Sequence, residues 1–284
     1  MNMIKENLYQ PFEIEFKTLD KFPRFERQKT FFELIYVLDG NGKQFINENK
    51  FDYKPGNLFL LTPQDTHSFE ITKTTQFFFL RFNEIFIRTQ KAKNYDDGDW
   101  IHQMKFILEN ASHQPGCILK NQTDKPIIRD LVESIIREQT NQQLYYNKII
   151  RHIVNTMLTI VARNIALRLP ERIKENTDES VLDILHYIHQ NIYEPEKLKA
   201  QKMSKELGIS LSYLGRYFKK HTGESMQQYI TNYKLKLVET RLLHSDMRIN
   251  EIAYELNFTD ESHLNRIFKK YKLVNPSEFR KNRH

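Results

Sequence analysis

A repeated segment near the C-terminus constrains this 284-residue chain more than any other feature. The stretch ELGISLSYLGRYFKKHTG, residues 206–223, returns in altered form as ELNFTDESHLNRIFKKYKL, residues 255–273. Four matched positions, each 50 residues apart, fix the register: Leu214 with Leu264, Arg216 with Arg266, Phe218 with Phe268, and Lys219-Lys220 with Lys269-Lys270. Self-similarity at a fixed spacing indicates a duplicated structural unit.

The spacing within each copy predicts a helix, a tight turn and a second helix. In the second copy, apolar residues recur at helical spacing before the pattern breaks: Ile249, Ile252, Ala253 and Leu256. Asn257-Phe258 forms the break, and Thr259 or Asp260 can cap the helix that follows. The first copy breaks at Gly208-Ile209 and offers Ser210 as its cap. A short capped helix that buries one face and exposes Arg, Ser and His on the other fits a DNA major groove.

An ordinary bundle of helical hairpins would show the same apolar spacing. It would not explain the repeat, nor an exposed arginine at the same place in both second helices. Charge points the same way, because residues 197–284 hold 18 Lys+Arg against 9 Asp+Glu, whereas residues 1–196 hold 25 against 27. A basic charge confined to the repeated segment suits a polyanionic partner. We therefore expect this segment to bind double-stranded DNA.

The whole chain is long enough for two domains with separate cores. Its composition, 39% hydrophobic and 12% aromatic, is typical of a folded protein. It has no N-terminal signal pattern and no run of 18 apolar residues, so we expect a cytoplasmic protein that does not enter a membrane. A single cysteine, Cys117, excludes an intramolecular disulfide and a cysteine-based zinc site.

The N-terminal part alternates in a β pattern. A strand at Phe31–Leu38 is followed by the turn signal Asp39-Gly40-Asn41-Gly42, which predicts a hairpin with Lys43–Ile46. We expect further short strands at 51–53, 57–61, 67–71 and 76–82, with turns at Pro55-Gly56 and Pro63-Gln64-Asp65. Six or so short strands at even spacing predict a small barrel or jelly roll.

The phrase ELIYVLDGNGKQFINENKFDYKPGNLFLLTPQDTHSF resembles the cupin-type sensor half of bacterial regulators. Metal-binding cupins carry a His-x-His pair where this chain reads Phe31-Phe32-Glu33. His67 and a distant Glu33 do not supply the three or four ligands that a transition metal needs, so we expect no metal site. The barrel can instead hold a small-molecule effector. The candidate pocket residues are Tyr36, Phe45, His67, Phe79 and Arg81.

Helical patterns follow the strands. Apolar stripes begin near Trp100 and continue in two helices over about 126–169, the second apolar over enough of its surface to suggest a homodimer contact. The polar stretch at 170–180 reads as a linker. The expected architecture is therefore α+β: a cupin-like sensor and dimerisation domain at 1–169 (barrel about 8–95, helices about 98–169), and an all-α domain at 181–284. In the latter, a long helix from Met226 to Leu243 joins two helix-turn-helix units.

The chain resembles the AraC/XylS family of transcription regulators, fully over 181–284 and more loosely over 1–180. The closing segments SHLNRIFKK, residues 262–270, and NPSEFR, residues 275–280, carry the resemblance. It implies that the first recognition helix presents Ser212, Gly215 and Arg216 to the bases, and the second Ser262, His263 and Arg266. It also implies phosphate contacts from Ser210, Tyr213, Lys219, Lys220 and Lys269. Four positions depart from the family pattern: Lys234, Val238, Asn257 and Leu273.

The resemblance implies an effector-responsive, sequence-specific regulator of transcription, most commonly an activator. Its partners would be promoter DNA, a small-molecule effector and RNA polymerase, with no cofactor and no catalytic residue. Two alternatives differ in class. An effector-independent DNA-binding protein would lack a ligand response, and a cupin-type enzyme with a helical accessory domain would need an open metal site.

Overall fold

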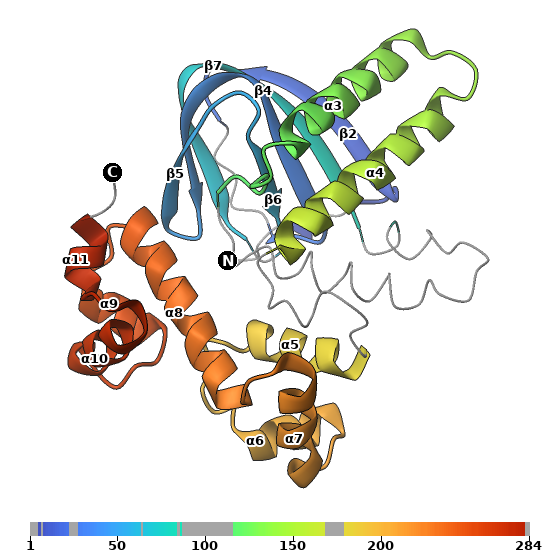
Figure 1. The fold of residues 1–284 in the computed structure, drawn as a ribbon. Coiled ribbons are helices and arrows are strands. Elements are labelled where there is room, and N and C mark those ends of the chain that lie inside the picture. The colour runs from blue at the N-terminus through green and yellow to red at the C-terminus, as the bar shows by residue number, and fades with distance from the viewer. Residues whose placement is uncertain are drawn as a thin grey trace. The chain divides into compact units, whose positions relative to one another are not determined.

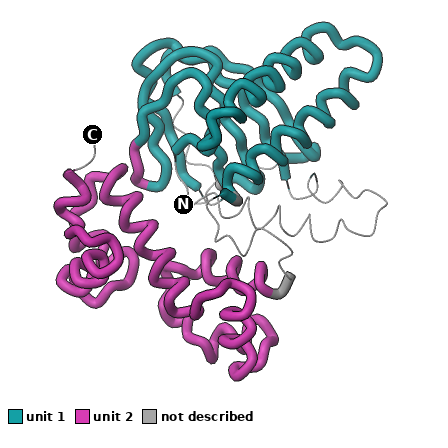
Figure 2. The backbone as a smooth tube through the Cα atoms, in the orientation of Figure 1, with its two compact units in different colours: residues 1–47, 51–169 teal, residues 48–50, 170–284 magenta. Residues whose placement is uncertain are grey.

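The computed structural model describes residues 5–6, 8–22, 28–63, 65–83, 86, 116–167 and 179–281. The chain forms two compact units (Figure 2). One comprises residues 1–47 and 51–169, and the other comprises residues 170–284 with residues 48–50. The helix predicted near Trp100 and nearly all of the predicted linker at 170–180 lie outside the described residues.

The first unit is built on a five-stranded sheet in the order β2-β7-β4-β5, with β6 also paired to β4, and a separate two-stranded pair of β1 and β3 (Figure 1). The strands are β1 (Lys5–Glu6), β2 (Phe12–Leu19), β3 (Gln28–Lys29), β4 (Phe32–Ile46), β5 (Asn49–Tyr53), β6 (Leu58–Leu61) and β7 (His67–Phe82). β7 runs antiparallel to both β2 and β4. This matches the expected cupin-like sheet domain in kind, with fewer and longer strands.

The predicted hairpin at Asp39–Gly42 is wrong. β4 continues through these residues, and the turn lies instead at Asn47-Glu48, where both residues have positive φ. The glycines serve the sheet in another way. Gly40 has φ 98° at a point where the β4–β7 register shifts, and a Cβ on Gly42 would lie 2.1 Å from the carbonyl oxygen of Glu70. They therefore bend the strand and allow close backbone approach.

The strands predicted separately at 67–71 and 76–82 are one 16-residue strand, β7. The polar residues between them have no turn geometry, and Thr75 is fully buried there. Bulges opposite Gly40 curve the pair of long strands, so a break in the sequence pattern marks a bend in the sheet.

On either side of the bulges, side chains alternate between the two faces of the sheet. One face packs against α3 (Asp124–Asn141) and α4 (Tyr146–Ala166), which lie together in Figure 1, and its core includes Leu34, Phe78 and Met157. The other face is concave and rich in aromatic residues, including Phe69 and Phe77. We refer to this second face as the concave face.

The second unit is all-helical. Its helices are α5 (Glu179–Gln190), α6 (Ala200–Leu207), α7 (Leu211–Thr222), α8 (Met226–His244), α9 (Ile249–Glu255), α10 (Glu261–Lys272) and α11 (Pro276–Lys281). The pairs α6–α7 and α9–α10 are the two predicted helix-turn-helix units, and α8 contacts both α7 and α9. The buried residues of α8 lie around much of its circumference, because α8 packs against both helix-turn-helix units. These buried residues are Tyr229, Ile230, Leu235, Leu237, Val238, Arg241 and Leu242.

Candidate nucleic-acid interface and ligand pocket

The second helix of the first helix-turn-helix unit, α7, has an apolar face and a polar face. Leu214 and Phe218 are fully buried, whereas Ser212 and Arg216, one helical turn apart, are exposed. The Arg216 Nε donates to the Ser212 carbonyl oxygen at 3.1 Å. Ser210 occupies the N-cap position, but its hydroxyl accepts no capping hydrogen bond. The predicted base-reading side chains therefore share one accessible face.

The second helix of the second helix-turn-helix unit, α10, repeats this arrangement and also has a side-chain cap. The Asp260 carboxylate accepts from the His263 N–H at 2.7 Å, which selects Asp260 over Thr259 as the cap. Ser262 and Arg266 are exposed one turn apart. His263 is half-buried, and its Nδ1 accepts from the Thr259 N–H at 3.3 Å. Only its Nε2 is therefore left to meet a base.

The predicted phosphate-binding lysines lie in the last turns of these helices. Lys219 and Lys220 end α7, Lys269 lies at the equivalent place in α10, and all three are exposed. Their charges also face the negative end of the helix dipole, which favours cations there. Tyr213 is half-exposed and stacks on Tyr217 with 5.0 Å between ring centroids.

The turns explain two departures from the family pattern. In the first helix-turn-helix unit, Gly208 ends α6 with φ 67° and Gly223 ends α7 with φ 84°. In the second, Asn257 takes φ 56° and donates its side-chain N–H to the Tyr193 carbonyl oxygen at 2.8 Å. Leu273 takes φ 66° while it is 83% exposed. Equivalent left-handed positions are thus occupied by residues that differ in how well they tolerate a positive φ.

Two contacts connect α8 to the second helix-turn-helix unit. The Arg241 guanidinium is buried and forms a two-point ion pair with Glu255 of α9, including an Nε–Oε2 distance of 2.8 Å. Lys234, which stands where the family usually has Arg, lies 5.9 Å above the ring of Phe258 in the turn. Burial lowers the pKa of its ammonium group. Both contacts lie at the C-terminal end of α9, so they fix the turn of the second helix-turn-helix unit to α8.

The concave face of the first unit carries a buried ionic cluster at its rim. Glu33, 2% exposed, forms an ion pair with Lys29 and accepts from the Arg81 Nε at 2.8 Å. His67 Nε2 lies 2.8 Å from the Lys29 Nζ and 3.4 Å from Glu33 Oε2. Burial alone raises the pKa of Glu33, but the contact with His67 and the charge of Lys29 lower it far below its usual range. Burial lowers the pKa of His67.

The contacts in this cluster show that the sheet is strongly curved. Arg81 and His67 lie near opposite ends of β7, 14 residues apart, yet both contact Glu33. A straight strand of that length would span roughly 45 Å. The two long strands must therefore curl until their ends converge, which produces the concave chamber that the sequence predicted as a barrel.

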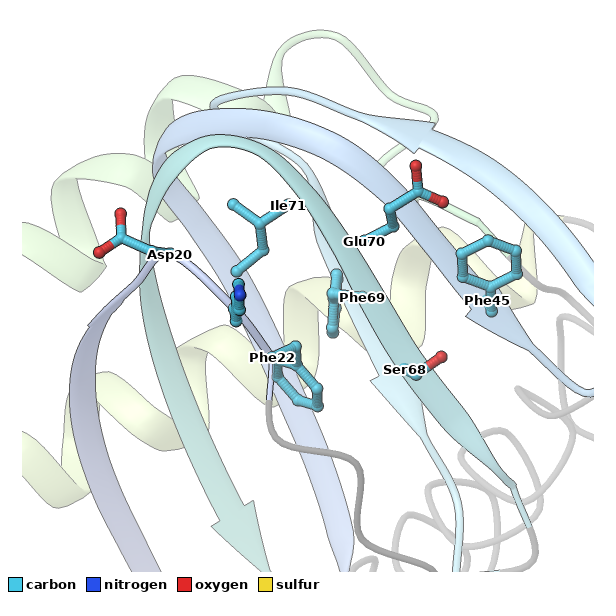
Figure 3. A pocket seen from close by; sticks show the side chains of 8 residues that line it. Asp20, Phe22, Phe45, Ser68, Phe69, Glu70 and Ile71 are labelled. Atoms are coloured by element: carbon cyan, nitrogen blue, oxygen red, sulfur yellow. The ribbon is translucent and has the colours of Figure 1, made fainter.

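The predicted pocket residues are distributed over both faces. His67 and Phe79 lie on the concave face, and Arg81 belongs to the ionic cluster. Tyr36 lies on the opposite face, in the core with α3 and α4, because it alternates with Ile35 along β4. Phe45 lines an open pocket of about 550 Å³ (Figure 3). The full lining is Asp20, Lys21, Phe22, Phe45, Ser68, Phe69, Glu70 and Ile71.

Sequence reasoning missed Gln44, which is fully buried on the concave face of β4. It shares the alternation of Gly42 and Ile46, but the register shifts between Val37 and Gly42 change the parity of the strand, so alternation carried on from Ile35 and Val37 would have placed it on the other face. Among the described residues, no group of three His, Cys, Asp or Glu side chains could hold a metal ion. None of the described helices combines the length and apolar character needed to cross a membrane.

Comparison with known proteins agrees with this geometry. A family model described as an AraC-like ligand binding domain matches residues 14–148, and one described as a helix-turn-helix domain matches residues 203–282. The multiple antibiotic resistance protein MarA of Salmonella typhimurium is 35% identical over 108 residues, which are 38% of this chain and 84% of MarA. The chain belongs to the AraC/XylS family. It is a DNA-binding transcription regulator with a ligand-binding unit, and its relatives are regulators rather than enzymes.

Members of the AraC/XylS family also match the chain along most of its length. The HTH-type transcriptional activator RhaS of Mannheimia succiniciproducens is 25% identical over 255 residues, covering 90% of this chain and 88% of RhaS. A solved structure of ToxT from Vibrio cholerae covers 95% of this chain and 97% of that chain, at 13% identity and a TM-score of 0.36.

Proposed function

We propose that the protein reads promoter DNA through α7 and α10 and responds to a small-molecule effector held on the concave face. The observation that supports this proposal best is that two helices expose the same Ser–Arg–Lys pattern at equivalent positions of duplicated units. Two such helices in one chain suit two major-groove segments about one helical turn, ~34 Å, apart.

Arginines and lysines have separate roles in this proposal. Arg216 and Arg266 suit bidentate pairing with guanine, which discriminates by about 1–3 kcal/mol per contact. Ser210, Tyr213, Lys219, Lys220 and Lys269 position the protein on phosphates without reading sequence. His263, with one free ring nitrogen, supports Arg266 in the second box.

Selection of DNA from a random pool by the fragment 178–284 tests the reading helices. We expect a motif with two short boxes. Arg266→Ala should relax one box and Arg216→Ala the other. Lys269→Ala is the matched control, and it should weaken binding to all sequences equally and reduce the salt slope by about one. A motif that is unchanged by Arg266→Ala would refute the assignment of α10.

The relatives' names support transcriptional activation as the outcome, with RNA polymerase as the partner recruited at the promoter, and we place this action in the cytoplasm. A reporter gene behind the selected motif distinguishes activation from repression. Expression should rise when the chain is present, and it should fall back to background with Arg266→Ala. A fall below background with the wild-type chain would indicate a repressor.

We further propose that the helical hairpin α3–α4, within residues 126–169, forms a homodimer contact. Apolar side chains of the predicted stripe remain exposed there, including Ile149 at 40% and Leu167 at 52%. Ile149→Glu should shift the protein from dimer to monomer in sedimentation velocity. Arg151→Glu, on an exposed polar position of the same helix, should not. A wild-type chain that is monomeric at all concentrations refutes the proposal.

A further inference from the structure

The concave face contains buried polar groups that have no hydrogen-bond partner in the part of the chain that the structure describes. Gln44 is 0% exposed, and neither its amide oxygen nor its amide nitrogen has a hydrogen-bond partner among the described residues. An unpaired buried amide costs free energy, and buried polar groups in proteins nearly always have a partner. A group kept in this state points to a partner that arrives from outside the chain.

His67 supplies a second such group. In a neutral imidazole the role of Nδ1 follows the tautomer: an Nε2 that accepts from Lys29 leaves the proton on Nδ1, and an Nε2 that donates to Glu33 leaves Nδ1 as an acceptor. That Nδ1 is buried and has no hydrogen-bond partner among the described residues. Gln44 pairs in register with Phe69, and Ile46 pairs with His67. Gln44 and His67 are therefore diagonal neighbours on one face of two adjacent strands, within reach of one small molecule.

The pocket of Figure 3 shares two aromatic residues with the surroundings of His67. Phe22 and Phe69 both line it, and both contact the His67 ring, with centroid separations of 5.6 and 6.0 Å. Figure 3 shows the two rings next to each other in the wall of the pocket. A ligand in the pocket would thus contact the two aromatic rings that pack against His67.

The charges around the chamber leave no excess of cations: the pocket lining holds Lys21 together with the two carboxylates of Asp20 and Glu70. The Glu33 carboxylate is held by Lys29 and Arg81, and Arg81 also pairs with Glu15 at 3.0 Å. No cation of this cluster is left over for a carboxylate or phosphate. Gln44 offers one acceptor and two donors, and a protonated Nδ1 of His67 offers one donor.

We infer that the effector is an uncharged molecule with hydroxyl or amide groups close together, held by Gln44 and His67 and packed on Phe22 and Phe69. This rests on the proposed function of the first unit as an effector sensor. It deepens that proposal by naming the chemical class and two anchoring residues.

Thermal unfolding of the full chain without ligand gives the first test. Gln44→Met keeps the length of the side chain and removes the unpaired groups, so we expect the melting temperature of the first unit to rise by about 2–6 °C. Gln44→Leu should act in the same direction. Gln76→Leu, at an exposed position of β7, is the control and should change little. A lower melting temperature in both Gln44 variants would mean that Gln44 is a structural residue, and it would overturn the inference.

The second test is a thermal-shift panel on the full chain. Neutral sugars and polyols form one arm, small amides the other, and each compound is run beside its carboxylate counterpart. At least one neutral compound should raise the melting temperature, with no shift in Gln44→Met. Shifts only by acids, shifts that persist in Gln44→Met, or no shift at all would each overturn the inference. The fragment 178–284 lacks this chamber, so DNA selection succeeds or fails independently.

Discussion

Two non-glycine residues in left-handed turns of the second unit should respond in opposite directions to the same substitution. Leu273 ends α10 with φ 66°, a conformation that costs an ordinary L-residue about 1–2 kcal/mol. It is 83% exposed, so replacing it by glycine forfeits only about 0.3–0.5 kcal/mol of apolar burial. Glycine also adds about 0.4–1 kcal/mol of entropy to the unfolded chain. Leu273→Gly should therefore stabilise the unit by about 0.5 kcal/mol.

Asn257→Gly is the matched comparison. Asparagine tolerates φ 56° at little cost, and it donates a hydrogen bond to Tyr193 that glycine cannot make. Losing that bond and adding the same unfolded-state entropy should destabilise the unit by about 1–2 kcal/mol. Thermal unfolding of the fragment 179–284, followed by circular dichroism, should show a rise of about 2–4 °C for Leu273→Gly and a fall of about 5–10 °C for Asn257→Gly. A fall in both variants would refute the claim that Leu273 is strained.

Three further predictions concern buried polar contacts. Asn164 is fully buried and makes four hydrogen bonds, three of which hold residues 120–124 to α4, so Asn164→Ala should lower the unfolding free energy by about 3 kcal/mol in urea titration. Glu255→Gln should cost about 2 kcal/mol, because it leaves the buried Arg241 guanidinium without its matching charge; a double-mutant cycle that gives no coupling would contradict this. The pKa of His67 is lowered by burial, so the unfolded state binds a proton that the folded state does not, and stability should fall as pH drops below about 6.5. Melting temperatures at pH 7.5 and 5.5 measure this fall, and His67→Gln should reduce it.

The second unit was predictable from sequence because its signals are local. A cap such as Asp260, a turn residue such as Asn257 and the buried pair Leu264 and Phe268 all lie within one short stretch of the chain, residues 257–268. Helical spacing therefore fixes which face is buried and which is exposed. The exception is His263, whose ring is partly occupied by its own turn, and no sequence pattern distinguishes that from a free base-reading residue.

The concave chamber was less predictable because its signals are long-range. The Gly40–Gly42 pattern is shared by hairpin turns and bulges, and only the partner strand decides between them. The bulges also change the parity of β4, so neither a turn nor an unbroken strand predicts the inward position of Gln44. Tyr36 was assigned to the pocket because it is aromatic and lies in a strand, yet both faces of this sheet are covered by apolar residues, so character alone could not choose between them.

The pairing of β2 with β7 has a consequence for how quickly each unit can form. Phe12 pairs with Phe82, 70 residues further along the chain, so completing the sheet requires distant parts of the chain to meet. The contacts of α6 with α7 and of α9 with α10 join neighbouring elements instead. Folding rates fall steeply as contacts become less local. The regulator should thus refold in two steps, with the helical unit competent to bind DNA before the chamber that is proposed to control it exists.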